Sequence, residues 1–195
     1  MKKILSVLCF CSISALATDM YVDYSTQNIS FKTVDVEMVG GTVGVSWGDR
    51  TRFYIEGNIQ SDNTKNINYY DVVIGINGDI VKNESFRLGW DIGIGAGQLD
   101  VPWYSNKNAM LSLPIGLDMV YRLTDKVMLN AGVGYKYFLD LTDNQQYTIC
   151  NDGSISESSG SGTCSWHGGI AGYSTNDLIG NGGGVSAQVG LTYKF

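Results

Sequence analysis

The chain has 195 residues, of which 19 are acidic and 13 are Lys or Arg, so its formal net charge is −6. An acidic balance argues against nucleic acid as a partner, because nucleic-acid-binding surfaces depend on basic patches. The sequence is also rich in Gly (25) and Tyr (12) but has only two Pro. After residue 17, no apolar run approaches the roughly 20 residues that a membrane-spanning helix needs.

Residues 1–17, MKKILSVLCFCSISALA, begin with two lysines, continue with a short apolar run and end with small residues. This order is typical of a secretory signal peptide cleaved after Ala17. An N-terminal membrane anchor is the alternative, but the apolar run is short for a spanning helix. Cleavage removes Lys2 and Lys3, which changes the formal charge from −6 to −8, and leaves residues 18–195 as one domain.

Eight stretches then alternate apolar and polar residues with a period of two, which predicts strands. The apolar positions of these stretches lie within Met20–Tyr24, Val34–Trp47, Phe53–Ile59, Tyr70–Ile76, Phe86–Ala96, Leu113–Tyr121, Val127–Tyr137 and Val185–Phe195. In the second stretch the parity of the apolar residues changes near Val39–Gly41, which predicts a glycine-containing bulge. Most stretches have about the length that a tilted strand needs to cross a bilayer.

The connections between these strands alternate between short and long. Gly48–Thr51, Val81–Ser85 and Leu123–Lys126 are tight, whereas Asp62–Asn68, Asp100–Met110 and the loop at about 141–183 are longer. Short turns at one end and long loops at the other are typical of an up-and-down outer-membrane barrel. An even number of strands places both chain ends on the turn side, in the periplasm.

The aromatic residues indicate which face of the barrel looks outward. Residues such as Trp47, Phe53 and Tyr121 lie on the apolar face near the turns, and Tyr24 and Tyr135 lie on it near the loops. Two aromatic girdles around an aliphatic band favour a lipid-facing surface. A soluble barrel or sandwich with aromatic residues in its core is the alternative.

The chain ends in QVGLTYKF, with Gln188, Gly190, Tyr193 and Phe195 at spaced positions. This ending resembles the C-terminal signature of bacterial outer-membrane barrels, and the stretch YRLTDKVMLNAGVGYKY (121–137) is similar to their seventh strand. The whole mature chain thus resembles the small barrels of the OmpA transmembrane-domain, OmpX and opacity-protein kind.

That resemblance implies an all-β, eight-stranded antiparallel up-and-down transmembrane β-barrel in the outer membrane of a Gram-negative bacterium. The four terminal-strand residues would then be an assembly signal read by the barrel-assembly machinery. The remaining expected partners are outer-membrane lipid and lipopolysaccharide, and the barrel is expected to be a monomer.

Parity places several charged side chains inside the barrel. The network expected near its middle and turn end consists of Arg52, Glu56, Arg87, Asp91, Asp118 and Arg122. Glycines on neighbouring strands should make room for the Arg and Lys side chains. Buried charges must pair, so we expect ion pairs across the lumen. They either fill a narrow barrel or gate a thin pore.

The longest loop contains CNDGSISESSGSGTC, in which Cys150 and Cys164 are the only cysteines left after cleavage. Outside the cytoplasm they should form a disulfide. Trp103, Tyr104, Trp166 and Tyr173 are loop aromatics that could contact a surface ligand or cover the barrel mouth.

Other chemistry is sparse. His167 is the only histidine, and Ser165 lies two residues away, a spacing that does not fix a catalytic geometry. A carboxylate pair of Glu56 and Asp91 would lack a nucleophile and substrate access. We therefore expect no catalytic residues, no metal and no cofactor. The sequence predicts a non-enzymatic, adhesin-like surface protein that acts through its loops; the alternative is a small porin-like channel.

Overall fold

The structure is a computed structural model, and it describes residues 19–32, 34–102, 108–142, 146–156, 158, 162–175 and 179–195. The predicted signal peptide, residues 1–17, lies outside this set. No helix long and apolar enough to cross a membrane occurs among these residues.

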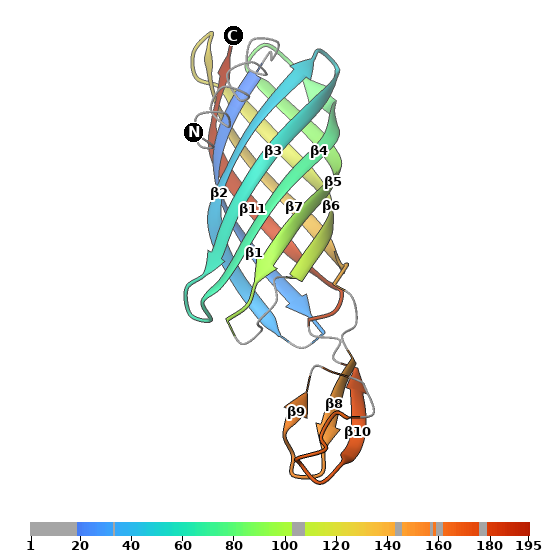
Figure 1. Cartoon of the computed structure of the whole chain (residues 1–195). Helices are drawn as coiled ribbons and strands as arrows, with labels where there is room; N and C mark the ends of the chain where they lie inside the picture. The colour runs from blue at the N-terminus through green and yellow to red at the C-terminus, as the bar shows by residue number, and fades with distance from the viewer. Residues whose placement is uncertain are drawn as a thin grey trace, which may run out of the picture.

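Eight long strands close into one barrel (Figure 1). They are β1 (Asp19–Phe31), β2 (Asp35–Gly48), β3 (Thr51–Asp62), β4 (Ile67–Lys82), β5 (Phe86–Asp100), β6 (Asn108–Arg122), β7 (Val127–Asp140) and β11 (Gly182–Lys194). Their order around the barrel is β1-β11-β7-β6-β5-β4-β3-β2, and every neighbouring pair is antiparallel. The predicted fold class, an all-β eight-stranded up-and-down barrel, is confirmed.

The barrel closes between its first and last strands. The β1–β11 ladder runs from Asp19 opposite Lys194 to Phe31 opposite Gly182. This pairing satisfies the backbone of both terminal strands, so the barrel has no open edge. The first strand therefore begins where the last one ends, at the end of the barrel that carries the tight turns; we call this the turn end and the opposite one the loop end.

The predicted bulge near Val39–Gly41 is wrong. Residues 35–46 of β2 pair with β1 without interruption, and its pairing with β3 is also continuous. A register shift does occur in the pairing of β4 with β5, where it lies between Asp79 and Val81 of β4. The change of apolar parity in β2 therefore has another cause.

That cause is a reversal of the two barrel faces along the strand. In the half of β2 nearer the turn end, Thr42 and Ser46 are buried inside and Val43 and Trp47 lie on the outer face; near the loop end, Val36 and Met38 are buried inside and Asp35 and Glu37 are exposed outside. On β1 the inner residues change from Asp23 and Ser25 to Ile29 and Phe31, while the outer ones change from Val22 and Tyr24 to Asn28 and Ser30.

The loop between β7 and β11 contains structure that the sequence analysis left as loop. A small antiparallel sheet, in the order β10-β8-β9, is formed by β8 (Gln146–Cys150), β9 (Ile155–Ser156) and β10 (Ile170–Thr175). We call residues 146–175 the loop sheet. Figure 1 shows it beyond the loop end of the barrel, separate from the barrel wall.

Candidate functional site

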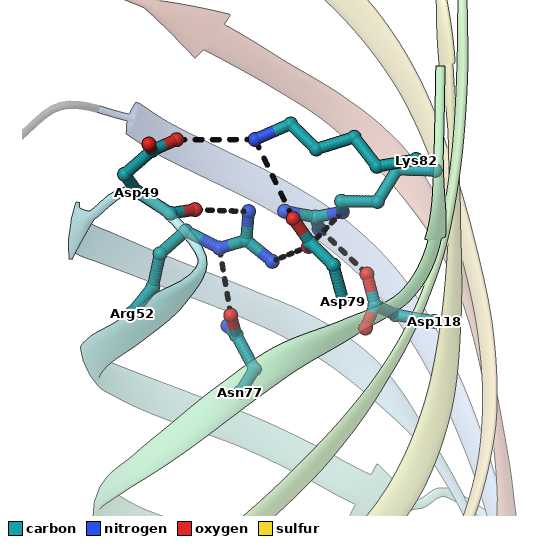
Figure 2. A network of polar contacts seen from close by, with 7 residues as sticks. Asp49, Arg52, Asn77, Asp79, Lys82 and Asp118 are labelled. Carbon is teal, nitrogen blue, oxygen red and sulfur yellow. Dashed lines mark hydrogen bonds and ion pairs between the residues drawn. The ribbon is translucent and has the colours of Figure 1, made fainter.

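The turn end of the lumen holds a network of ion pairs centred on Asp79 (Figure 2). Arg52 Nη2 lies 2.7 Å from Asp79 Oδ1, and its Nε donates to Asn77 Oδ1 at 2.7 Å. Lys82 bridges Asp79 at 3.4 Å and Asp49 at 3.2 Å. Arg52 and Asp79 are largely buried, whereas Lys82 is half exposed and Asp49 lies in the turn between β2 and β3, so the network reaches from the lumen to the solvent at the turn end.

Arg87 extends this network to the next strand pair. Its Nη2 lies 2.6 Å from Asp118 Oδ2, and its Nε is 3.9 Å from Asp79 Oδ1. Arg87 and Asp118 are both largely buried, with side-chain exposures of 19% and 15%. Paired charges at this depth are held in place, because separating them would leave a charge without its partner in the interior.

On the loop-end side of this network, the lumen is lined by acidic side chains and contains a polar cavity of about 130 Å³. Glu56 accepts hydrogen bonds from Tyr21 Oη at 2.9 Å and from Asn58 Nδ2 at 3.3 Å. Asp23 accepts one from Asn130 Nδ2 at 2.5 Å. Asp91 also lines the cavity. Among the described residues, no cation forms an ion pair with these three carboxylates.

A single buried ion pair separates this cavity from the loop end. Lys136 Nζ lies 2.7 Å from Asp71 Oδ2, and the Asp71 side chain is fully buried. Asp71 also accepts hydrogen bonds from Tyr69 Oη at 2.6 Å and Ser112 Oγ at 3.0 Å. Lys136 Nζ also lies over the rings of Tyr69 and Phe138. The ion pair therefore contacts the apolar side chains on its loop-end side.

The loop end of the lumen is filled by a cluster of buried apolar side chains, which we call the apolar plug. Its members are Ile29, Phe31, Val36, Met38, Ile67, Tyr69, Leu99, Val101, Met110, Phe138 and Ile179. Phe138 packs against Phe31 and Tyr69, with ring centroids 5.6 and 5.4 Å apart. Protein interiors of this kind are packed too densely to admit water or ions, so the plug closes the lumen among the residues that the structure describes.

Glycines make room in the lumen for acids and tyrosines, where the sequence analysis expected room for Arg and Lys. A Cβ at Gly116 would lie 2.5 Å from Asp91 Oδ1, and one at Gly89 would lie 2.5 Å from Asp118 Oδ1. Such distances are too short for real atoms. The carboxylates therefore occupy the space that a side chain on the neighbouring strand would need.

The predicted lumen network is divided among several layers of the structure. Arg52, Arg87 and Asp118 belong to the turn-end network, but the partner of Arg52 is Asp79. Glu56 and Asp91 line the acidic cavity above it. Arg122 is exposed at the turn-end rim and makes no ion pair with the described residues. The alternation along each strand identifies the residues that point inward. Which of them contact each other depends on the pairing register between strands, which the sequence does not give.

The loop sheet is tied together by the disulfide between Cys150 and Cys164, whose Cα atoms are 5.3 Å apart. Around it, Asn151 N donates to Gly169 O, and both His167 N and Gly169 N donate to Cys164 O, each at 2.9 Å. Closing a loop of this length stabilises a chain by roughly 3 kcal/mol in the chain-entropy account. The disulfide therefore joins the end of β8 covalently to the turn that carries Cys164.

An exposed acid–histidine pair lies beside this disulfide. His167 Nδ1 is 2.6 Å from Asp152 Oδ2, and Asp152 Oδ1 accepts hydrogen bonds from the hydroxyl and backbone N–H of Ser154. These hydrogen bonds from Ser154, and then the neighbouring His167, lower the pKa of Asp152 to about 2. The sequence analysis missed this pair. Its only signal is that each residue follows a cysteine of the disulfide by two or three positions.

Trp166 is 95% exposed, more than any other large apolar residue of the described chain. It lies between the cysteine-bearing turn and His167, in a segment where Cys164, Gly168 and Gly169 all have positive φ. For Tyr173 the structure describes the backbone within β10, and Trp103 and Tyr104 lie outside the described residues. Trp166 is thus the predicted contact residue whose side chain the structure places.

The residues of the predicted assembly signal lie on both faces of β11 and, for Phe195, just beyond its end. Gln188 lines the acidic cavity, whereas Tyr193 and Phe195 are exposed on the outer face with their rings 5.4 Å apart. Gly190 lies against β1, where a Cβ would clash with Val22 and Asp23. The terminal strand therefore needs its glycine for barrel closure and presents its aromatic rings outward.

Among the described residues, no group of three His, Cys, Asp or Glu side chains could hold a metal ion. Asp152 and His167 form an acid–histidine pair of the kind found in catalytic triads. Ser165, two residues before His167, has a backbone N–H that donates to Gly162 O, and no contact joins its hydroxyl to His167 among the described residues.

Comparison with known proteins supports the fold and leaves the family open. A family model described as "Domain of unknown function (DUF3761)" matches residues 144–174. The match therefore covers the loop sheet except its last residue, Thr175, and none of the barrel strands. No curated protein matches the chain.

Solved structures of small barrels resemble most of the chain. The crystal structure of neisserial surface protein A has a TM-score of 0.58 at 12% identity, covering 91% of this chain and 96% of that one. The N-terminal β-barrel domain of Pseudomonas aeruginosa OprF has a TM-score of 0.50 at 10% identity, covering 92% and 98%. At such identities the likeness establishes the barrel fold alone.

Proposed function

We propose that this protein is a non-enzymatic surface-interaction protein of a Gram-negative outer membrane, adhesin-like in its action. Its barrel is a closed platform, and its loop sheet is the interaction element. The observation that carries this proposal is the contrast between a lumen filled at the loop end and a rigid loop sheet that exposes Trp166 almost completely.

The outer surface of the barrel supports the membrane location. Large apolar side chains such as Ile74, Ile115 and Val133 are about half exposed on its middle band. A soluble protein rarely exposes so many, but a lipid-facing barrel must. Outer-membrane lipid and lipopolysaccharide would surround this band, and the barrel-assembly machinery would read β11. We expect a monomer, because closure leaves no strand edge to pair.

A small porin-like channel is the second candidate. The polar cavity of about 130 Å³ favours it, since this space lies in the lumen between the turn-end network and the Lys136–Asp71 pair. Conduction would require the apolar plug to move aside, together with that pair. The packing of Phe138 against two aromatic neighbours makes this costly.

The test is loop removal on the intact barrel. Cells displaying the wild-type protein and a variant that lacks residues 151–163 and carries Cys150→Ser and Cys164→Ser are compared for adhesion to host-cell and extracellular-matrix surfaces. Equal surface levels and heat-modifiable gel mobility establish that both barrels are inserted. Arg122→Gln, at the opposite rim, is the control.

We expect the loop variant to lose adhesion and Arg122→Gln to retain it. Adhesion that is the same for all three proteins would contradict the proposal. Reproducible ion conductance by the wild type, with unchanged adhesion in the loop variant, would favour the channel.

A further inference from the structure

The two ends of the barrel differ in charge. Among the described residues of the segments 26–39, 60–69, 98–110 and 138–184, at the loop end, six are acidic and two are lysines, a formal charge of −4. Residues 19–22, 45–54, 78–89, 120–127 and 192–195, at the turn end, include five acidic and seven basic residues, a formal charge of +2. The acidic character of the chain is therefore concentrated on the side that carries the loop sheet.

In the sequence of the loop between β7 and β11, every Asp, Glu, Lys or Arg position is occupied by an acidic residue. Between Leu141 and Gly183 the sequence has four Asp or Glu and no Lys or Arg. At the neighbouring strand ends, Asp35 and Glu37 are exposed, while Lys65 is already engaged by the Asp62 carboxylate and the Asp35 carbonyl. A surface of this sign attracts cationic partners from a distance and repels anionic ones.

Trp166 provides a contact surface within this field. A fully exposed indole costs free energy in water, and Trp is the side chain most enriched at the energetic centres of interfaces. Its ring is also the best aromatic acceptor for a Lys or Arg cation. The Asp152 carboxylate lies 2.6 Å from Nδ1 of His167, the residue that follows Trp166. It is ionised at physiological pH, as an ordinary Asp is, and Ser154 and His167 lower its pKa further, to about 2.

The loop sheet holds these groups in place before any partner arrives. The disulfide fixes the turn that precedes Trp166, and Asn151 Nδ2 donates to Gly168 O at 2.6 Å on the far side of it. A preorganised site loses less conformational entropy on binding than a flexible loop would.

We propose that Trp166 and Asp152 form a recognition site for a Lys- or Arg-rich protein segment, with the cation stacked on the indole and steered by the acidic loop end. This inference rests on the proposed surface-interaction function and names the chemistry of its partner. Polyanionic ligands such as sulfated glycans or nucleic acid do not suit this surface, because the loop has no Lys or Arg to neutralise them.

The test uses the refolded chain, residues 18–195, in detergent with the disulfide intact. Ten-residue oligoarginine, oligolysine and oligoglutamate peptides are titrated by fluorescence anisotropy. We expect both cationic peptides to bind and oligoglutamate not to bind. Trp166→Ala should weaken oligoarginine binding about fivefold, the size of a cation–π contact of roughly 1 kcal/mol, and Trp166→Phe should weaken it less.

Asp152→Asn and Asp49→Asn form the matched pair of charge variants. Both positions carry exposed carboxylates, but Asp49 lies at the turn end. Asp152→Asn should weaken binding and Asp49→Asn should not. Equal effects of the two variants, or no effect of Trp166→Ala, would overturn the inference, because binding would then be unspecific charge attraction.

The two proposals fail in different ways. If the loop deletion abolishes adhesion while peptide binding is independent of Trp166, the surface function stands and the cationic partner is wrong. If the loop deletion leaves adhesion unchanged, the surface function itself is wrong.

Discussion

The middle of the barrel and its loop end are built from the same strands with opposite patterns. In the middle, Val22 and Tyr24 of β1 face outward and Asp23 and Ser25 face inward; at the loop end, Asn28 and Ser30 face outward and Ile29 and Phe31 face inward. The alternation never breaks. What changes is the solvent on each side of the wall.

This difference indicates that one strand crosses two environments. Where the outer face meets hydrocarbon, apolar side chains belong outside and the lumen can hold paired charges. Where the wall extends into water, the ordinary rule of soluble proteins returns, and the apolar side chains pack inside. The plug is therefore both the core of the loop-end segment of the barrel and the group of side chains that fills the lumen there.

The largest effect is expected from removing an aromatic ring from the plug, which tests whether the loop end of the lumen is a packed core. Phe138 is 1% exposed, so Phe138→Ala should lower the free energy of unfolding by about 3 kcal/mol or more. Val133→Ala, on the outer face of the same strand, should cost much less. Urea titration of both variants in lipid vesicles measures the difference, and equal costs would contradict a packed plug.

The next effect concerns the ion pair below the plug. Lys136→Met leaves the Asp71 carboxylate buried without its cation, and we expect a loss of about 3 kcal/mol in the free energy of unfolding. The double variant Lys136→Met/Asp71→Asn should recover most of this loss, because both charges are gone. A double-mutant cycle by urea titration checks it; additive losses would show that the two groups do not interact.

An arginine placed on the outer face tests whether the apolar band and the loop end of the barrel wall meet different surroundings. On β4, Ile74 lies in the apolar band and Asn68 near the loop end. Ile74→Arg should cost about 2 kcal/mol or more, as at the middle of a bilayer, whereas Asn68→Arg should cost close to nothing. The free energy of unfolding in vesicles is again the measurement. Equal costs at both positions would contradict the reversal of faces.

The smallest expected effect is a pH dependence of the loop sheet. The pKa of Asp152 falls from 3.8 to about 2, because Ser154 and His167 favour its ionised form. A lowered pKa stabilises the folded loop sheet above pH 4, and this stabilisation is lost as the pH falls from about 4 to 2. NMR titration of the His167 and Ser154 signals should show a midpoint near 2 that Asp152→Asn abolishes; a midpoint near 4 would mean that the contacts do not form.

Strand number, closure and most inward positions could be predicted, because strict alternation over eight segments is a strong signal. The reversal of faces could not. The sequence analysis treated every apolar residue as outward, so Val36 and Met38 required a bulge that does not exist. Only the position of each residue along the barrel reveals whether its outer neighbour is lipid or water.

The candidate sites divide in the same way. The disulfide could be predicted, because Cys150 and Cys164 are the only cysteines left after the expected cleavage and the chain is expected outside the cytoplasm. The structure joins them. The partner of Arg52 did not follow, because Asp79 approaches it only through the β3–β4 register, in which Thr51 lies opposite Gly78. The loop sheet was missed because β8 and β9 are too short to show a periodic pattern.

The central claim is that the barrel is closed and serves as a platform, and single-channel recording tests it most directly. The refolded chain, residues 18–195, is inserted into a planar bilayer after its heat-modifiable gel mobility has established folding. We predict no unitary current steps from the wild type and their appearance in Phe31→Ala/Phe138→Ala, which empties the plug. Reproducible steps of one size from the wild type would contradict the account.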